Sequence, residues 1–541
     1  MTGALRSTTA RRSTRVLTVL ASATLALTAC GGGGGADRSA SSASAPDQSE
    51  RCTEDKAGGT ITMGEYAMLP TFAPGQGQFG VRGAAESAAV YDRLMRWNPE
   101  SEEFEPKLAE SLESNDDNTV WTLKLRDGVT FSNGDELTAD DVAFTIDKHK
   151  DPATRSNALT DALQVKEAKV VDPQTVEFTL EEAWAGFPIV LAGPAGEVLP
   201  QKAYEAASPE DWARNPVGAG AFTLASYTPD QEVVLEPNPD YYGGPVCPTL
   251  KFIRIPGSQG TYEAFQTGEL QVGFLRGAKT VTDAQDAGEK GFEVITSSGS
   301  VVNLNAGNAG YDGVLTDERA RQAVGFALDR DLINDRLTGG FGMPTSAILS
   351  ETSRFYDGEQ GPTYDVDKAT ALVEEVKADR PDWNGQLTLL IADSPENMET
   401  GVAIKSLLDA AGFDVKLENA PVSQVVARQF TGDFEAVVGG LSPSDADPAA
   451  AFASGMTRGG ATNISGIDNP ELTAALTELK AAKDLDAQKA GYSKLQEVHN
   501  KVMPFTVIAD SEEYVVVDDS VKGVSPTLFS TMLFDGAFVQ E

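Results

Sequence analysis

Two histidines, three cysteines and 81 acidic side chains are the residues of this 541-residue chain that could support nucleophilic, acid–base or metal chemistry. His149 and His499 each stand in a stretch of helical pattern, which predicts solvated or structural histidines and not catalytic bases. The chain has neither the G-x-S-x-G pattern of a nucleophile elbow nor the H-E-x-x-H pattern of zinc proteases. So few histidines and cysteines also leave little material for a metal site. We expect a protein that is not an enzyme and that holds no metal or cofactor.

One pattern associated with nucleotide binding, G-x-G-x-x-G, occurs from Gly75 to Gly80. In a dinucleotide-binding unit these glycines lie directly at a turn between a strand and a helix. Here Pro70 and Pro74 intervene after the strand expected at 60–63, and no P-loop lysine follows. The pattern therefore predicts a flexible loop and no nucleotide site.

The segment 442–448 contains two carboxylates, Asp445 and Asp447, at a place where they could contact a ligand. This segment directly follows the apolar run 436–438, which is typical of a buried strand. Ligands of open α/β sheets bind beyond the carboxyl ends of the strands, so carboxylates there could receive a cationic group. A hydrated turn explains the same spacing equally well, and both interpretations stay open.

The chain as a whole is strongly acidic, with a net charge of −38 and a pI near 4.4. Such a surface repels phosphate backbones, so we expect no nucleic-acid partner. Hydrophobic residues make up 41% of the chain, a globular share that excludes wholesale disorder. The length allows about three domains or two large lobes.

Residues 1–29 combine four arginines with a short apolar run, the pattern of a bacterial signal peptide. They end in Leu-Thr-Ala before Cys30, which resembles a lipobox, in which the cysteine carries the lipid. Residues 30–57 would then be a lipidated cysteine and a flexible tether. An ordinary signal peptide is the alternative. The pair Arg11-Arg12 leaves twin-arginine export open beside the Sec route, which we favour.

Export would place Cys52 and Cys247 in an oxidising compartment, where two cysteines most simply form a disulfide. The bond would close a loop of roughly 200 residues, worth about 5 kcal/mol of unfolding free energy in the chain-entropy model. Two free buried thiols are the alternative.

The first half of the remaining chain reads as strands and turns. Residues 119–125 alternate apolar and polar side chains with a period of two, and 165–180 has the pattern of a hairpin. A helix is expected to begin at Thr138, with Asp140 and Asp141 in its first turn.

Helices prevail between about 300 and 510, and one of them is expected to be capped by Thr316. In the same region, strands at 387–391 and 413–417 flank a helix. This order is that of a βαβ unit, which predicts a parallel or mixed sheet.

Eight stretches together resemble the family 5 extracellular solute-binding proteins of ABC importers, the dipeptide, oligopeptide and nickel group. They follow the family's order and spread over nearly all of the expected mature chain. They are Ala89–Leu94, Pro106–Ser111, Trp121–Gly134, Thr138–Val142, Asn215–Gly220, Asn238–Tyr242, Thr267–Leu270 and Asp317–Ala323.

The resemblance implies an α/β fold of two lobes, a periplasmic-binding-protein-like clamp of type II with an extra subdomain in lobe I. In this family lobe I takes the first part of the chain and the C-terminal tail. We accordingly expect lobe I with its extra subdomain at 58–298, lobe II at 299–508 and a return to lobe I at 509–541.

The resemblance also suggests where a ligand would bind. In peptide-binding relatives, an aspartate of lobe II pairs with the α-ammonium group of the ligand. When the family pattern is aligned on the Asp447-Pro448 step, the position of this aspartate falls on Ser444, and Asp445 is the next residue. Leu441 stands where an aromatic residue is common before that position. Either the loop has shifted and Asp445 takes the role, which we favour, or no free peptide N-terminus is bound. The full set of expected ligand-binding residues is Glu65, Tyr66, Asn303, Asn305, Gly439, Gly440, Leu441, Ser444, Asp445 and Asp447.

The function implied by the resemblance is that of a monomeric lipoprotein on the outer face of the bacterial cell membrane. It would capture a short peptide by closing its lobes and deliver it to an ABC permease driven by ATPase subunits. One alternative is the same clamp with a non-peptide solute, namely an oligosaccharide, an opine-like compound or a metal chelate. A secreted hydrolase is a further alternative, and so is a clamp that presents a bound peptide to a signalling partner.

Overall fold

The computed structural model describes residues 45–77 and 83–540. The expected signal peptide and the lipid-bearing Cys30 lie outside these ranges, as do Gln78–Gly80 of the G-x-G-x-x-G pattern. Within the described ranges, no helix is both long enough and apolar enough to cross a membrane.

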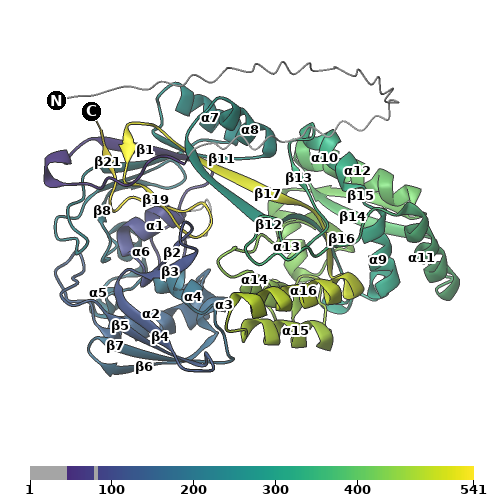
Figure 1. Cartoon of the computed structure of the whole chain (residues 1–541), viewed down its shortest axis with the longest axis horizontal. Coiled ribbons are helices and arrows are strands. Elements are labelled where there is room, and N and C mark those ends of the chain that lie inside the picture. Colours follow the sequence, from purple (N-terminus) through teal and green to yellow (C-terminus); the bar gives the residue numbers. More distant parts are fainter. Residues whose placement is uncertain (1–44, 78–82, 541) are drawn as a thin grey trace, which may run out of the picture. The chain divides into compact units, whose positions relative to one another are not determined.

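The largest sheet in the described chain has eleven strands, in the order β15-β14-β16-β12-β17-β11-β1-β10-β9-β8, with β13 paired to β17 (Figure 1). It is mixed, as the sequence predicts, because β1 runs parallel to β10 and β11 while β17 runs antiparallel to β11 and β12. The strands are β1 (Thr60–Glu65), β8 (Phe222–Thr228), β9 (Glu232–Pro237), β10 (Thr249–Arg254), β11 (Val272–Arg276), β12 (Gly291–Leu304), β13 (Met343–Pro344), β14 (Gln386–Ala392), β15 (Asp414–Ala420), β16 (Ala436–Gly439) and β17 (Phe505–Val517).

Two long adjacent strands, β12 and β17, join the two lobes of the molecule. In the strand order, β1 and β8–β11 lie on one side of this pair, in the part here called lobe I, and β14–β16 lie on the other side, in the part here called lobe II. The chain enters lobe II along β12 and leaves it along β17, and the two strands pair antiparallel from Gly291↔Val516 to Asn303↔Phe505. Their register shifts between Thr296 and Ser300, so the ladder is irregular near its middle.

Lobe I has a hydrophobic core on its side of the large sheet. Ile61 of β1 and Phe252 of β10 pack there with Val515 of β17 and with Phe534, so the end of the chain returns to this lobe. Its helices are α1 (Ala84–Tyr91), α5 (Gln201–Ala206), α6 (Pro209–Arg214), α7 (Ser258–Gln266) and α8 (Ala278–Asp286), and its short C-terminal strands are β18 (Val521–Lys522), β19 (Ser525–Pro526), β20 (Met532–Leu533) and β21 (Phe538–Val539).

Lobe I also carries the subdomain, which has a core of its own built around Leu123, Ile146 and Phe178. Its sheet has the order β4-β5-β7-β6, and β2 and β3 form a separate hairpin. The elements are β2 (Met95–Asn98), β3 (Glu103–Pro106), β4 (Ala109–Ser114), β5 (Val120–Leu125), α2 (Ala139–Lys150), α3 (Leu159–Ala162), β6 (Val165–Asp172), β7 (Thr175–Leu180) and α4 (Pro188–Ala192), with 3₁₀ turns at Pro152–Thr154 and Pro194–Gly196.

The local predictions for this subdomain are confirmed. β6 and β7 form the expected hairpin. Helix α2 begins after Thr138, and the carboxylate of Asp141 accepts hydrogen bonds from the Thr138 backbone N–H and hydroxyl at 2.9 and 2.8 Å. This reciprocal cap fixes the start of the helix.

Lobe II contains the predicted βαβ unit, since β14 and β15 pair in parallel over seven residues and α12 connects them. One expected cap is wrong by one residue: the carboxylate of Asp317, and not Thr316, accepts the hydrogen bond from Arg319 N at 2.9 Å. Thr316 instead ends a 3₁₀ turn and donates its hydroxyl to Gly313 O at 2.7 Å. The helices are α9 (Glu318–Ala327), α10 (Arg330–Thr338), α11 (Val366–Asp379), α12 (Pro395–Ala410), α13 (Val422–Thr431), α14 (Pro448–Met456), α15 (Pro470–Lys480) and α16 (Leu485–Val502), with 3₁₀ turns at Asn308–Gly310 and Val314–Thr316.

A disulfide joins Cys52 to Cys247, the pairing expected from the sequence. Both cysteines are buried with Phe538. Cys52 N donates to Gly536 O at 2.8 Å, and Gly58 N donates to Cys247 O at 2.9 Å. The segment before β1, which contains a 3₁₀ turn at Glu54–Lys56, is the last part of the expected tether 30–57. The disulfide holds this segment against both β10 and the C-terminal end.

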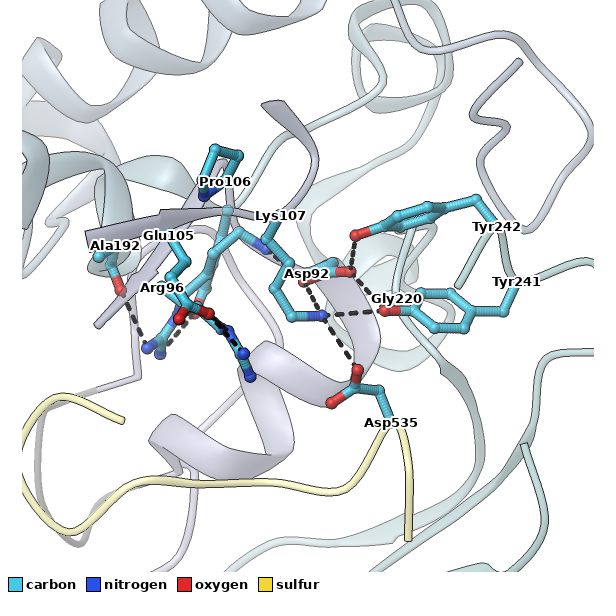
Figure 2. Close-up of polar contacts among 12 residues, drawn as sticks. Asp92, Arg96, Glu105, Pro106, Lys107, Ala192, Gly220, Tyr241, Tyr242 and Asp535 are labelled. Atoms are coloured by element: carbon cyan, nitrogen blue, oxygen red, sulfur yellow. Dashed lines mark hydrogen bonds and ion pairs between the residues drawn. The ribbon is translucent and has the colours of Figure 1, made fainter. Parts of the chain in front are cut away.

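A buried polar network ties three parts of lobe I together (Figure 2). The ammonium group of Lys107 lies 2.7 Å from Asp92 Oδ1, 2.9 Å from the Tyr241 hydroxyl and 3.9 Å from Asp535 Oδ2. The hydroxyls of Tyr241 and Tyr242 donate to Asp92 Oδ2 at 3.1 and 3.0 Å. Burial would lower the pKa of Lys107, but the carboxylates of Asp535 and Asp92 raise it, so the lysine stays charged.

Three of the eight stretches that carry the family resemblance meet in this network. Asp92 belongs to the first, Lys107 to the second, and both tyrosines to the stretch Asn238–Tyr242. These residues hold the subdomain, the large sheet and the C-terminal return together. They do not line the cavity described below.

We expect Lys107→Met to lower the free energy of unfolding by about 3–5 kcal/mol, because it leaves the buried carboxylate of Asp92 without its cation. Denaturant and thermal unfolding of the full chain would measure the loss. Lys124→Met is the matched control, since the ion pair of Lys124 with Glu110 is half-exposed and its removal should leave the unfolding midpoint nearly unchanged. Equal stability of the two variants would contradict the structural role of the network.

Candidate functional site

A cavity of about 840 Å³ lies between the subdomain of lobe I and lobe II. Lobe I contributes α3 and the loop after β7, with Asp161, Gln164 and Trp184 among the lining residues. Lobe II contributes the end of β16, helix α14 and the loop 457–462. Pockets for small molecules occupy about 300–1,000 Å³, so the cavity has the size of a ligand site.

Six of the expected ligand-binding residues line this cavity. They come from β12, from the end of β16 and from the segment that leads into α14. They are Asn303, Gly439, Gly440, Leu441, Ser444 and Asp447. The pairing of β12 with β16, from Val301↔Gly439 to Leu304↔Ala436, brings these three segments together.

Close packing explains the glycine pair at the end of β16. A Cβ atom at Gly440 would lie 2.5 Å from Gly299 O, so a larger residue cannot pass this close to β12. A Cβ atom at Gly439 would lie 3.1 Å from the side-chain amide nitrogens of both Asn303 and Gln429, which line the cavity as well. Side-chain amides can donate and accept, as the main chain of a bound peptide requires.

The other four expected residues lie outside the lining of this cavity: Glu65, Tyr66, Asn305 and Asp445. Asn305 is fully buried, and its side-chain amide donates to Gly432 O at 3.1 Å and to Phe434 O at 2.9 Å. Its carbonyl oxygen accepts from the backbone N–H groups of Gly307 and Asn308. This amide therefore holds two loops of lobe II in place.

Glu65 and Tyr66, at the end of β1, are engaged within lobe I. Glu65 is buried, and its pKa is raised by burial and by the neighbouring carboxylate of Glu86. Burial raises the pKa of Glu86 to about 7. The guanidinium of Arg276 donates to the Tyr66 hydroxyl at 3.1 Å and lies 4.2 Å from the centre of the Tyr66 ring.

Asp445 contacts residues of lobe II and not the cavity. Its carboxylate accepts hydrogen bonds from the Ser353 hydroxyl and the Arg354 backbone, and burial raises its pKa despite them. The guanidinium of Arg354 reaches across to lobe I, where it donates to Glu102 O at 3.0 Å. Asp445 thus lies next to a contact between the lobes.

Asp447 makes the most direct side-chain contact between the lobes at the cavity. Trp184 of lobe I donates its indole N–H to Asp447 Oδ2 at 2.6 Å, and Ala449 N donates to Asp447 Oδ1 at 3.1 Å. Burial raises the pKa of Asp447, while these two hydrogen bonds favour its charged form. A Cβ atom at Gly186 would lie 1.8 Å from Asp447 Oδ2, so the close approach of these two segments requires glycine at position 186.

Lys480 of α15 forms a second contact between the lobes. Its ammonium group lies 3.2 Å from Gln164 Oε1 and 3.9 Å from Glu182 Oε2. Its carbonyl oxygen accepts from Ala185 N at 3.0 Å. The amine also lies 5.0 Å from the ring centre of Trp184, so Lys480 and Asp447 both meet this tryptophan.

Asp161 of α3 is a cavity-lining carboxylate that the sequence does not single out. It is half-buried, and burial raises its pKa to about 6. In the sequence it is one of 81 acidic residues in a stretch without a motif, so only the folded structure distinguishes it.

Both histidines are structural, as predicted, although they are buried and not solvated. His149 Nδ1 lies 2.7 Å from the Ser156 hydroxyl, and the centre of the His499 ring lies 4.6 Å from that of Phe505, with the two ring planes tilted by 53°. Burial lowers the pKa of each histidine to about 4, so both are neutral at pH 7.

Two curated proteins are similar to this chain in sequence over most of its length. The dipeptide-binding protein of Escherichia coli K12 is 26% identical over 473 residues, which are 81% of this chain and 87% of that protein. Heme-binding protein A of Haemophilus influenzae is 26% identical over 571 residues, covering 96% and 98% of the two chains.

Two solved structures share the fold. DppA from Helicobacter pylori, in complex with the peptide STSA, matches with a TM-score of 0.74 at 23% identity over 90% of this chain and 99% of that chain. The dipeptide binding protein from Pseudoalteromonas sp. SM9913, in complex with Met-Leu, matches with a TM-score of 0.74 at 20% identity over 89% and 100%. The predicted two-lobe α/β fold is thereby confirmed.

The family model of the bacterial extracellular solute-binding proteins, family 5, matches residues 103–463, which are more than half of the chain. The resemblance found in the sequence is confirmed at the level of the family. This chain therefore belongs to the family 5 bacterial extracellular solute-binding proteins, and it binds a solute outside the cytoplasm and is not an enzyme.

Proposed function

We propose that this chain is the lipid-anchored substrate-binding protein of an ABC importer and that it captures short peptides between its lobes. The cavity between the lobes carries this proposal, because its walls come from both lobes and its volume suits a small ligand. The names of three of the four similar proteins support the ligand class, since one is a dipeptide-binding protein and two solved structures hold peptides, while the fourth is named for heme.

The lining of the cavity suits a peptide main chain. The side-chain amides of Asn303, Gln429 and Gln164 combine hydrogen-bond donors with acceptors. We assign ligand contact to Asn303, Gly439, Gly440, Leu441 and Ser444.

We further propose that lobe I comprises 58–298 and 509–541, and that lobe II comprises 299–508. Hydrophobic packing supports these bounds, since β1 and the C-terminal strands share one core while the described residues of lobe II form three others. With these bounds, the two points where the chain passes between the lobes lie at the irregular part of the β12–β17 ladder. A change of backbone angles there breaks few hydrogen bonds.

In this proposal the lobes close over the ligand, and the closed form is what an ABC permease and its ATPase subunits recognise. Closure needs a ligand that binds the closed form more tightly than the open form. The hydrogen bond of Trp184 with Asp447 and the contacts of Lys480 belong to the closed form, because each joins the two lobes. We propose that the protein acts as a monomer at the outer face of the membrane.

Native mass spectrometry of the protein purified from its own host should reveal bound peptides of two to six residues. The walls of the cavity carry both donors and acceptors for a main chain, which favours this class. Protein unfolded and refolded without ligand, as a control, should lose the added mass. Recovery of a sugar or a metal chelate in its place would remove the peptide proposal but leave the clamp.

Trp184→Phe should weaken peptide binding, because it removes a hydrogen bond that exists only between closed lobes and leaves the buried carboxylate of Asp447 with one donor fewer. The cost is about 1–3 kcal/mol, so calorimetry should show a loss of roughly 5- to 150-fold in affinity. Trp383→Phe is the matched control, since its indole N–H donates to Gln386 O within lobe II at 2.8 Å. Equal affinities for the two variants would contradict the proposed closure contact.

Cys30→Ser should release the protein from the membrane, because no acyl chain could then be attached to the residue that follows the signal peptide. Cell fractionation and labelling with a radioactive fatty acid would measure the change. Ser42→Ala, in the expected tether, should remain in the membrane fraction. Lipid labelling of the Cys30→Ser variant would show that the anchor lies elsewhere.

A further inference from the structure

Among the residues that the structure describes, one carboxylate in the wall of the cavity has no partner. Asp161 lines the cavity from α3, and in the described part of the chain its side chain makes no hydrogen bond or ion pair. The backbone carbonyl of Asp161 does have a partner, since it accepts a hydrogen bond from Gln164 N at 3.1 Å.

The other charged groups of the cavity contrast with Asp161, because most of them are paired. Asp447 is held by Trp184, Glu182 lies 3.9 Å from Lys480, and Arg458 lies 3.1 Å from Asp468. Glu181, on the rim, is exposed. The charge that remains uncompensated in the cavity is consequently negative.

A half-buried carboxylate without a counter-charge is unfavourable for the free protein, and its pKa of about 6 reflects that cost. A cationic group brought by a ligand would remove the cost and form a charge-assisted hydrogen bond. Two apolar side chains, Leu163 and Phe430, one from each lobe, line the same cavity and expose 53% and 59% of their surfaces. They could cover the aliphatic part of such a ligand.

We propose that Asp161 binds an ammonium or guanidinium group of the captured ligand, so that the protein prefers cationic peptides. This inference rests on the proposed function, because it specifies the ligand class of the same cavity. It places recognition of the positive charge on the subdomain of lobe I, on a residue outside every motif of the sequence.

The test uses the full chain and four tetrapeptides that each carry one lysine at a different position in an alanine background. Calorimetry compares each lysine peptide with two others. One has norleucine in place of lysine, which keeps the aliphatic stem without the charge, and the other is the same lysine peptide with an acetylated N-terminus. Asp161→Asn should weaken the best lysine peptide at least tenfold and its norleucine partner less than twofold. If acetylation and not norleucine reproduces the loss, the bound cation is the peptide's α-ammonium group.

Asp147→Asn is the matched control. It removes a carboxylate of α2 in the same subdomain, and the side chain of Asp147 is 76% exposed. It should change no affinity by more than twofold. The thermal midpoint of Asp161→Asn should equal or exceed that of the unmodified protein, because an unpartnered charge has been removed. A lower midpoint with equal losses for all peptides would indicate a structural role and overturn the inference.

The failure of this inference and that of the proposed function are distinguishable. Peptides that bind the unmodified protein equally with lysine and with norleucine, and equally with free and acetylated N-termini, would overturn the role of Asp161 alone. If none of the peptides binds the unmodified protein, the proposed function fails, and the inference fails with it.

Discussion

The antiparallel pair of β12 and β17 is the constraint on which the rest of the structure depends. The chain passes between the lobes along these strands, and at their irregular centre Ser298 has a positive φ of 50°. Asp510 Oδ1 accepts a hydrogen bond from Ser298 N at 3.0 Å, and Leu441 N donates to Ser298 O at 3.1 Å. The crossing between the lobes is therefore bonded directly to a residue that lines the cavity. Ser442 N also donates to Ser298 O, at 3.5 Å, so a ligand that displaces this segment would act on the crossing through two backbone hydrogen bonds.

The residues that reveal the family and those that line the cavity are different. Asp92, Lys107 and Tyr241 stand in recognisable stretches because they build the buried network that holds lobe I together. Asp161 stands in no such stretch, and its surroundings in the cavity alone give it significance. This division explains how one scaffold can serve proteins with different ligands: the scaffold residues keep their partners while the cavity residues are free to change.

Much of the fold could be predicted from the sequence because its signals are local. The alternation in β5, the capping box of α2 and the β14–α12–β15 unit each depend on neighbouring residues, and each is present in the structure. The cap of α9 was misplaced because Thr316 and Asp317 both have side chains that can cap a helix, and only the backbone angles choose between them. The disulfide followed from the cysteine count and the expected compartment.

The site could be predicted only in part, because partners distant in the sequence decide the role of each side chain. Asp445 and Asp447 are two residues apart, yet Asp447 meets Trp184 across the lobes while Asp445 meets Ser353 within lobe II. Asn305 resembles Asn303 in the sequence, but its amide is consumed by two carbonyl groups of lobe II. Such differences arise from tertiary contacts that no local pattern encodes.

Hydrogen-exchange mass spectrometry with and without a bound peptide tests the central claim most directly. If the ligand lies between the lobes, it should slow exchange in 157–164 and 181–184 of lobe I and, at the same time, in 439–444 and 457–462 of lobe II, with the crossing at 296–300 also affected. Protection confined to one lobe, or protection elsewhere on the surface, would contradict it.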